Sequence, residues 1–161
     1  MNTPIGKPRD TPLDRRNIGV LERFVMRGRV IILRLRGASV SSQARLYALP
    51  RVTWAPGLTI EAFASINNRV TLHAEGGITI REHARISDSA TLETRSLLLS
   101  DGCRNEHVKA PIIIERFAWI ATGAVVVRGV TVGERSVVSA NSLLRRDLPA
   151  DDASQHRPDL R

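Results

Sequence analysis

Aromatic residues and cysteine are scarce in this chain of 161 residues. Phe, Trp and Tyr make up 4% of the sequence, so large rings are not expected to dominate the core. Cys103 is the single cysteine, which excludes a disulfide within the chain and fits a reducing cytoplasm. No apolar run approaches the roughly 18 residues that suggest a membrane span. A cytoplasmic protein is therefore predicted.

The scarcity of aromatic residues also argues against nucleic-acid binding, despite a net charge of +8. The arginines are spread along the chain, and no nucleic-acid-binding motif is visible. The excess of positive charge is better suited to binding a ligand rich in phosphates or an anionic polysaccharide precursor.

The sequence does contain a six-residue repeat of aliphatic residues in its second half. A strand buries every second residue and an amphipathic helix every third or fourth, so neither produces this spacing. Three short flat segments around a shared core make one triangular coil of about eighteen residues. The repeated positions are Ile114, Ile120, Val126, Val132, Val138 and Leu144.

The repeat continues upstream with two shifts of register, each of two residues at a coil boundary. Its positions there are Val40, Leu46, Val52, Ile60, Ile66, Leu72, Ile80, Ile86 and Leu92. In the first, less regular coil, Pro50 and Pro56 suit corners. Small residues four places after most aliphatic positions fit narrow corners. The pattern predicts an all-β fold, a single-stranded parallel β-helix of about five coils with its layers about 4.8 Å apart.

The segments outside the repeat complete the predicted organisation. Residues 1–14 are expected to form a flexible arm, and residues 15–37 a basic amphipathic helix. The β-helix domain is expected over residues 38–150, with a loop at 98–113, followed by a flexible tail at 151–161. The helix has two possible roles. It caps the open end of the solenoid, or it attaches the chain to an anionic membrane surface or a partner enzyme.

The stretch PIIIERFAWIATGAVVVRGVTVGERSVVSANSLLRRDLPA, from Pro111 to Ala150, resembles the hexapeptide-repeat O-acetyltransferases. The colanic-acid, maltose and galactoside acetyltransferase branch is the most similar. The stretches LRLRGASV and GGITIREHARIS resemble the same branch. The resemblance implies a left-handed β-helix, a homotrimer, and acetyl transfer from acetyl-CoA to a hydroxyl of a sugar or polysaccharide precursor. It places the reaction in clefts between subunits and implies no metal.

The general base of that family is a histidine that precedes a long loop, and here Leu97 stands at the matching position. A sugar hydroxyl is a poor nucleophile until a base takes its proton. His107, in the loop, is the best replacement because histidine acts as a base near neutral pH. Asp101 or Glu106 can orient its ring. The alternative is that His107 is a solvated loop residue.

The resemblance also supplies residues for the donor. Trp119 matches a position at the border of the cleft, or it packs beneath the loop. Ala140 and Ser142 match small residues along the pantetheine arm. Arg145 and Arg146 stand where relatives have a Thr-Lys pair near the nucleotide, and they either bind phosphates or form a solvated rim.

The same fold has two alternative functions, a zinc enzyme and a protein without catalytic activity. A zinc site of the γ-carbonic-anhydrase type needs three converging histidines, and His73, His83 and His107 do not match its spacing. The alternative to an active acyltransferase is a catalytically inactive trimeric paralogue that acts as a scaffold or binding protein in a glycan pathway. Leu97 is its main support, together with a C-terminal stretch that departs from the Gly-x-Pro-Ala segment of the family.

Overall fold

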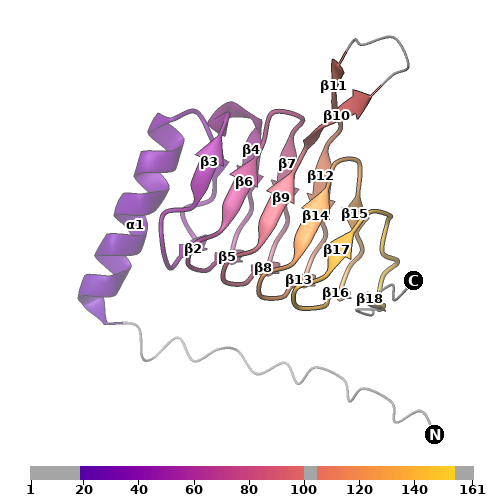
Figure 1. Cartoon of the computed structure of the whole chain (residues 1–161). Coiled ribbons are helices and arrows are strands. Elements are labelled where there is room, and N and C mark those ends of the chain that lie inside the picture. Colours follow the sequence, from indigo (N-terminus) through magenta and orange to yellow (C-terminus); the bar gives the residue numbers. More distant parts are fainter. Residues whose placement is uncertain (1–18, 100–104, 155–161) are drawn as a thin grey trace, which may run out of the picture.

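The computed structural model describes residues 19–99 and 105–154. One helix, α1 (Val20–Leu35), is followed by short strands that wind into a solenoid with three flat sides (Figure 1). A single turn of 3-10 helix, η1 (Ala55–Gly57), lies between the first and second coils. Two further strands, β10 (Arg95–Leu99) and β11 (Asn105–Lys109), form a hairpin outside the solenoid.

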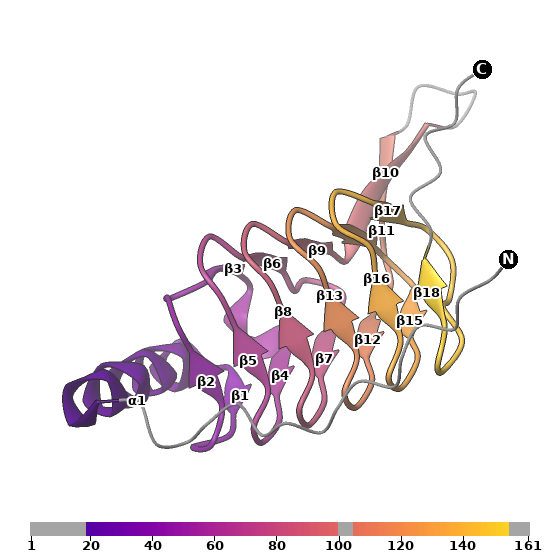
Figure 2. The ribbon, with the colours of Figure 1, turned by 90° about the horizontal axis from the view of Figure 1, so that it is seen from below.

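Each side of the solenoid is a parallel sheet. The first sheet contains β1 (Ser39–Val40), β4 (Leu58–Ile60), β7 (Ile78–Ile80), β12 (Ile112–Ile114) and β15 (Thr131–Val132). The second contains β2 (Arg45–Leu46), β5 (Ser65–Ile66), β8 (Arg85–Ile86), β13 (Trp119–Ile120), β16 (Val137–Val138) and β18 (Ala153–Ser154). The third contains β3 (Arg51–Thr53), β6 (Thr71–His73), β9 (Thr91–Glu93), β14 (Val125–Val127) and β17 (Leu143–Leu144). Each coil takes one strand from each sheet, and the predicted β-helix of about five coils is confirmed (Figure 2).

The register of the sheets explains the two shifts in the repeat. Val40 pairs with Ile60 and Ile60 with Ile80, so the early coils advance by 20 residues. Ile114 pairs with Val132, so the later coils advance by 18. The two additional residues lie in the corners between the third and first sheets, near Gly57 and Gly77. A Cβ atom at Gly57 would lie 2.1 Å from the carbonyl oxygen of Ala74, so this corner requires glycine.

The core is a column of aliphatic side chains with small residues at the corners. Ile60, Ile80 and Ile114 are stacked and almost completely buried, and the corner alanines such as Ala84 are equally buried. The two tryptophans, by contrast, lie at the surface, and Trp119 is 46% exposed. The prediction that large rings do not fill this core is confirmed.

Helix α1 covers the first coil, as one of its two predicted roles requires. Met26, Val30 and Leu33 are its buried side chains. Arginines next to them donate to carbonyl oxygens of the first coil: Arg29 Nη1 to Leu46 at 2.8 Å, Arg34 Nε to Val40 at 2.7 Å, and Arg36 Nη2 to Val52 at 2.8 Å. Among the described residues no earlier coil pairs with these strands, and the arginines satisfy part of their exposed edge.

The observed helix lies within the predicted range 15–37. It ends at Leu35, and Gly37 follows with a left-handed φ of 96° that turns the chain into β1. Residues 1–18, which include the predicted arm, lie outside the described residues. No helix in the described part of the chain is long and apolar enough to cross a membrane.

The tail predicted to be flexible from residue 151 begins instead as a strand. β18 pairs with β16 and extends the second sheet beyond the fifth coil. Asp151 anchors this strand through two bonds from Arg135, from Nε at 2.6 Å and from Nη2 at 2.7 Å. The prediction was wrong here because the last coil also exposes a strand edge, which the tail covers. Residues 155–161 lie outside the described residues.

The contact between Arg135 and Asp151 makes the attachment of β18 dependent on pH. The hydrogen bond from Arg135 outweighs desolvation and, together with the charge of Arg135, holds the pKa of Asp151 below its usual range. A carboxyl group whose pKa is lowered by folding stabilises the folded state at every pH above its ordinary pKa in the unfolded chain. This stabilisation is lost as the pH falls through the lowered pKa of the folded state. We expect Asp151→Asn to reduce hydrogen-exchange protection of the Val137 amide, which donates to the Asp152 carbonyl at 2.9 Å.

The difference from wild type should be present at neutral pH and should vanish well below about pH 4. Asp88→Asn, a change of the same kind in a middle coil, is the control and should leave Val137 protected. A difference between Asp151→Asn and wild type that persists in acid would contradict this role of the carboxylate.

Candidate active site

A β-hairpin projects from the solenoid where the sequence predicts the loop 98–113 (Figure 1). β10 and β11 are antiparallel, and the chain leaves the third sheet after β9 and enters the first sheet at β12. The edge of the solenoid where the third sheet turns into the first is called the hairpin edge below. Much of the predicted loop is therefore strand, and it holds its side chains in a defined register.

His107 lies directly opposite Leu97 in this hairpin. Opposed residues of an antiparallel pair point to the same face of the sheet, with Cβ atoms about 4.5–5.5 Å apart. The imidazole is therefore presented on the same face of the hairpin as Leu97, the position at which the resemblance leads us to expect a base. Both side chains are exposed, and Leu97 is 44% exposed.

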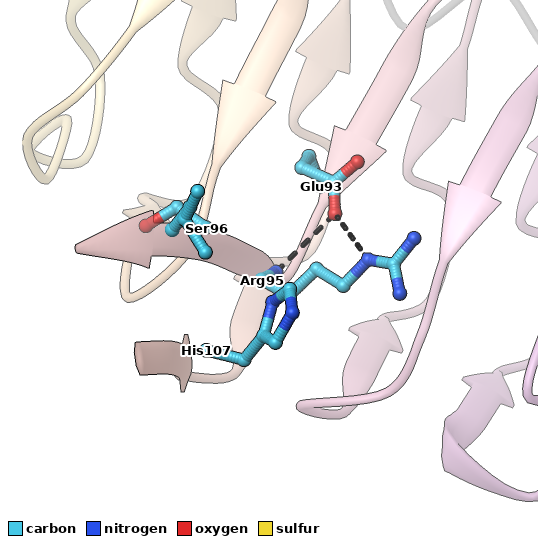
Figure 3. Close-up of a pocket in the computed structure, with 5 residues that line it drawn as sticks. Glu93, Arg95, Ser96 and His107 are labelled. Atoms are coloured by element: carbon cyan, nitrogen blue, oxygen red, sulfur yellow. Dashed lines mark hydrogen bonds and ion pairs between the residues drawn. The ribbon is translucent and has the colours of Figure 1, made fainter. Parts of the chain in front are cut away.

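A pocket of about 320 Å³ lies at the base of the hairpin (Figure 3). Its lining contains an imidazole, a carboxylate, a guanidinium, a hydroxyl and an aliphatic side chain, contributed by His107, Glu93, Arg95, Ser96 and Leu97. An imidazole thus shares an open pocket with side chains that can form hydrogen bonds to a polar molecule. Neither Glu93 nor Arg95 was identified from the sequence.

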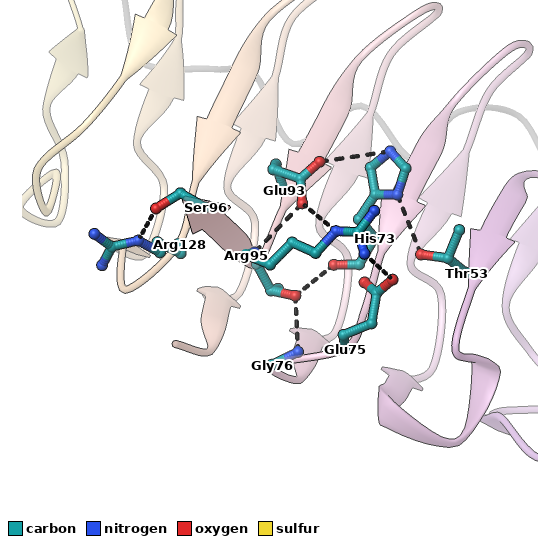
Figure 4. A network of polar contacts seen from close by, with 9 residues as sticks. Thr53, His73, Glu75, Gly76, Glu93, Arg95, Ser96 and Arg128 are labelled. Atoms are coloured by element: carbon teal, nitrogen blue, oxygen red, sulfur yellow. Dashed lines mark hydrogen bonds and ion pairs between the residues drawn. The ribbon is translucent and has the colours of Figure 1, made fainter. Parts of the chain in front are cut away.

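A polar network surrounds Arg95 (Figure 4). Its Nη1 lies 3.6 Å from Oε1 of Glu75, and its Nε lies 3.8 Å from Oε1 of Glu93. The other oxygen of Glu93 lies 3.6 Å from Nε2 of His73, whose Nδ1 is 3.1 Å from the hydroxyl of Thr53. Arg95 is thus held between two carboxylates, with one guanidinium facing two negative charges.

Glu75 is the most enclosed acid of the network, with a side chain that is 17% exposed. Burial by itself would raise its pKa. Hydrogen bonds from its own backbone and from Thr53, together with the charges of Arg95 and His73, outweigh burial, and the pKa lies below the usual range. Glu75 therefore stays ionised. Its Oε2 is buried and has no hydrogen-bond partner among the described residues.

Part-buried hydrogen bonds join the base of the hairpin to the coils on both sides of it. Thr94 is completely buried, and its hydroxyl donates to the His73 carbonyl at 2.5 Å and accepts from the Gly76 amide at 2.8 Å. On the other side, Nε of Arg128 donates to the hydroxyl of Ser96 at 2.5 Å. These bonds fix where the hairpin leaves the solenoid, and therefore where His107 lies.

The residues predicted for the donor occupy two different edges. Trp119 is exposed on the second sheet, with its Nε1 donating to the Ser87 hydroxyl at 2.8 Å. Ala140 is exposed in the turn between the second and third sheets. Ser142 follows in the same turn, but its side chain is buried and donates to the Ser139 carbonyl at 2.6 Å, so only its backbone is available.

Arg145 and Arg146 are exposed at the hairpin edge, one coil beyond Arg128. Val126 pairs with Leu144, and continuing that register by two residues places Arg146 beside Arg128. A basic strip thus runs along the hairpin edge from the base of the hairpin. Arg128 was missed in the sequence, although its spacing of 18 from Arg146 equals one coil.

The three histidines considered for a metal site are separated. His107 is on the hairpin and His73 belongs to the network. His83 is stacked between Phe63 and Phe117, with ring centroids 4.9 Å apart on each side. No group of three His, Cys, Asp or Glu side chains in the described ranges converges to hold a metal ion.

Comparison with known proteins places the chain in a family. It is 32% identical over 133 residues to the candidate colanic acid biosynthesis acetyltransferase WcaF of Escherichia coli, a match that covers 82% of this chain and 72% of WcaF. A hexapeptide-repeat-containing acetyltransferase of Vibrio cholerae, solved in complex with acetyl coenzyme A, is 26% identical with a TM-score of 0.63, and the match covers 85% of each chain. No protein-family model matches the chain.

A maltose O-acetyltransferase from Clostridium difficile shares the fold with a TM-score of 0.71 at 17% identity, over 86% of this chain and 83% of the other. The chain belongs to the hexapeptide-repeat acetyltransferase family, as the resemblance implied. Its solenoid is a left-handed parallel β-helix.

Proposed function

We propose that this protein transfers an acetyl group from acetyl-CoA to a hydroxyl of a sugar or polysaccharide precursor, with His107 as the general base. The observation that carries the proposal is the pairing of His107 with Leu97 across the hairpin. The family base is absent from its usual position, and an imidazole stands beside that position on the same face of the hairpin. The pocket next to it supplies polar groups for an acceptor.

The reaction needs one proton to move out and back. A nitrogen of His107 takes the proton of the acceptor hydroxyl as the oxygen attacks the thioester carbonyl carbon. The tetrahedral intermediate then collapses, the carbon–sulfur bond breaks, and the departing sulfur receives the proton from the imidazolium. Glu93 lines the pocket and can accept hydrogen bonds from sugar hydroxyls. Arg95 lies between Glu93 and Glu75 and offsets part of their negative charge.

The acetyl donor is acetyl-CoA, which the Vibrio cholerae relative binds. Arg145 and Arg146 project from the hairpin edge and can bind its phosphates, because guanidinium groups bind phosphate through two parallel hydrogen bonds. The resemblance assigns Trp119 to the border of the cleft, and Ala140 and Ser142 to the pantetheine arm. In one copy these residues lie on the other side of the third sheet. In a single copy the candidate residues therefore lie on two separate surfaces. A cleft between two copies would bring the two surfaces together.

The separation of these residues supports a homotrimer in which the hairpin edge of one copy faces the Trp119 side of the next. The relative WcaF is named for colanic acid biosynthesis, which supports a polysaccharide precursor as the acceptor. The single cysteine fits a cytoplasmic location. A catalytically inactive scaffold is the alternative. Leu97 favours the scaffold, whereas His107 directly opposite Leu97 favours an enzyme.

Calorimetry with acetyl-CoA, followed by thiol release with a panel of sugar acceptors, tests this function. We expect binding, and release that depends on the acceptor. Arg145→Ala/Arg146→Ala should weaken acetyl-CoA binding by about tenfold through lost phosphate contacts. Arg116→Ala, which removes an arginine paired with Glu82 on another edge, should leave binding unchanged.

The acetyltransferase and the inactive scaffold predict different results in these two assays. Binding without thiol release for any acceptor would favour the inactive scaffold. A lack of binding at millimolar acetyl-CoA would show that acetyl-CoA is not the donor and would contradict the proposed acetyl transfer. A monodisperse monomer in solution would contradict the proposed site between copies.

A further inference from the structure

Helix α1 has a second apolar face, opposite the one that covers the first coil. Leu33 and its buried neighbours face the coil, whereas another set of large apolar side chains faces outward. Their exposed fractions range from 43% for Ile32 to 82% for Leu35. The set comprises Leu21, Phe24, Val25, Ile31, Ile32 and Leu35. At 100° per residue these positions fall on one stripe of the helix, called the outer face below.

Helix α1 lies at one end of the described solenoid, with the outer face on the side away from the coils. In both views α1 lies across the first coil, with the rest of the solenoid on its other side (Figures 1 and 2). Copies that pack side by side along their sheets or edges, as the proposed cleft requires, leave such an end uncovered. Contiguous exposed apolar surfaces often mark interaction sites in soluble proteins. The occupant must therefore approach along the axis of the solenoid.

Basic residues border the outer face on both sides. The helix contains four arginines and one glutamate. Arg23 and Arg27 are exposed on one flank. Arg29 lies on the other flank, with Arg36 just beyond the end of the helix, and both donate to carbonyls of the first coil while keeping their charge. An apolar stripe between rows of positive charge is complementary to a surface that is apolar inside and anionic outside.

We propose that the outer face of α1 binds the surface of an anionic lipid membrane. The apolar side chains enter the boundary between headgroups and acyl chains, and the flanking arginines contact lipid phosphates. A second copy of this chain is a poorer occupant, because two outer faces in contact would bring their rows of arginines together. The helix lies in the plane of the membrane surface, with the axis of the solenoid directed away from it.

The trimer of the proposed function adds valency to this contact. Parallel copies around a three-fold axis would present three outer faces in one plane. Three weak contacts on one rigid body bind far more tightly than one. The lipid contact itself uses residues of one chain, so it does not depend on acetyl transfer.

Flotation with vesicles tests the proposal on the full chain. We expect binding to phosphatidylcholine vesicles that contain phosphatidylglycerol, and much weaker binding to phosphatidylcholine alone. High salt should weaken the binding by screening the arginines. Phe24→Ser/Leu35→Ser should lower the bound fraction at least about tenfold, because two anchoring side chains are lost. Both side chains are exposed, so thermal unfolding should match wild type.

Leu143→Ser is the matched control, since Leu143 is 48% exposed in the last coil, at the other end of the solenoid. It should leave vesicle binding intact. Thiol release in solution should be equal for wild type and Phe24→Ser/Leu35→Ser, which separates this test from the test of acetyl transfer. Failure to bind anionic vesicles would overturn the proposal. So would an assembly of higher order, without lipid, that Phe24→Ser/Leu35→Ser abolishes, because a second copy would then occupy the outer face.

Discussion

Acetyl transfer by His107→Ala is expected to fall by about 10²- to 10⁴-fold, the usual contribution of a positioned general base. The loss should appear in kcat, whereas acetyl-CoA affinity should stay within about twofold because the donor contacts are elsewhere. Single-turnover thiol release and calorimetry measure the two quantities. His83→Ala removes an exposed imidazole from a different edge and should keep full activity.

The cross-strand pairing allows a sharper test with Leu97→His/His107→Leu. This exchange keeps the composition of the hairpin and moves the imidazole to the directly opposite residue, with Cβ atoms about 5 Å apart. We expect it to recover at least part of the activity that His107→Leu loses. If His107→Leu turns over as fast as wild type, the base is another group. If both variants are inactive but bind acetyl-CoA, catalysis requires an imidazole attached to β11, and one attached to β10 does not replace it.

Ile114→Ala is expected to cost about 2–5 kcal/mol of unfolding free energy, the range for deleting a fully buried aliphatic side chain. Ile114 is completely buried and stacks between Ile80 and Val132, so its loss leaves a cavity that touches two coils. Urea unfolding at one fixed protein concentration measures the effect, since the stability of an oligomer depends on concentration.

Ile113→Ala provides the control on the same strand. Ile113 is half-buried because it points out of the first sheet, and its removal should cost less than about 1 kcal/mol. Equal costs for the two variants would contradict the assignment of Ile114 to the central column. A larger cost for Ile113→Ala would indicate that another copy covers the outer surface of the first sheet.

The sequence predicted the solenoid well because its signal is local. The spacing between Ile114, Ile120 and Val126 describes one coil without reference to any distant residue. The two shifts of two residues appear in the structure as coils that advance by 20 residues. The capping role of α1 followed from the need of every solenoid to close its end. The tail was predicted wrongly because β18 has no aliphatic repeat of its own to mark it as a strand.

The candidate site was predicted only in part. His107 was selected for its chemistry, and its role stays a prediction, but its place opposite Leu97 depends on the register of a hairpin. The Asp101-Gly102 pair after a run of leucines was a hairpin signal that was not used. Thr53, His73 and Glu93 are 20 residues apart, so the early coil length would have predicted their column on the third sheet.

The sequence by itself determined that this protein is a hexapeptide-repeat solenoid with a helix at one end, because the repeat encodes the coil within eighteen to twenty residues. The tertiary structure decided which polar side chains meet. The contacts of Arg95 with Glu75 and of Arg128 with Ser96 join different coils to the hairpin. Such contacts depend on the stacking of whole coils and on the corner from which the hairpin leaves, and neither is encoded in the spacing of nearby residues.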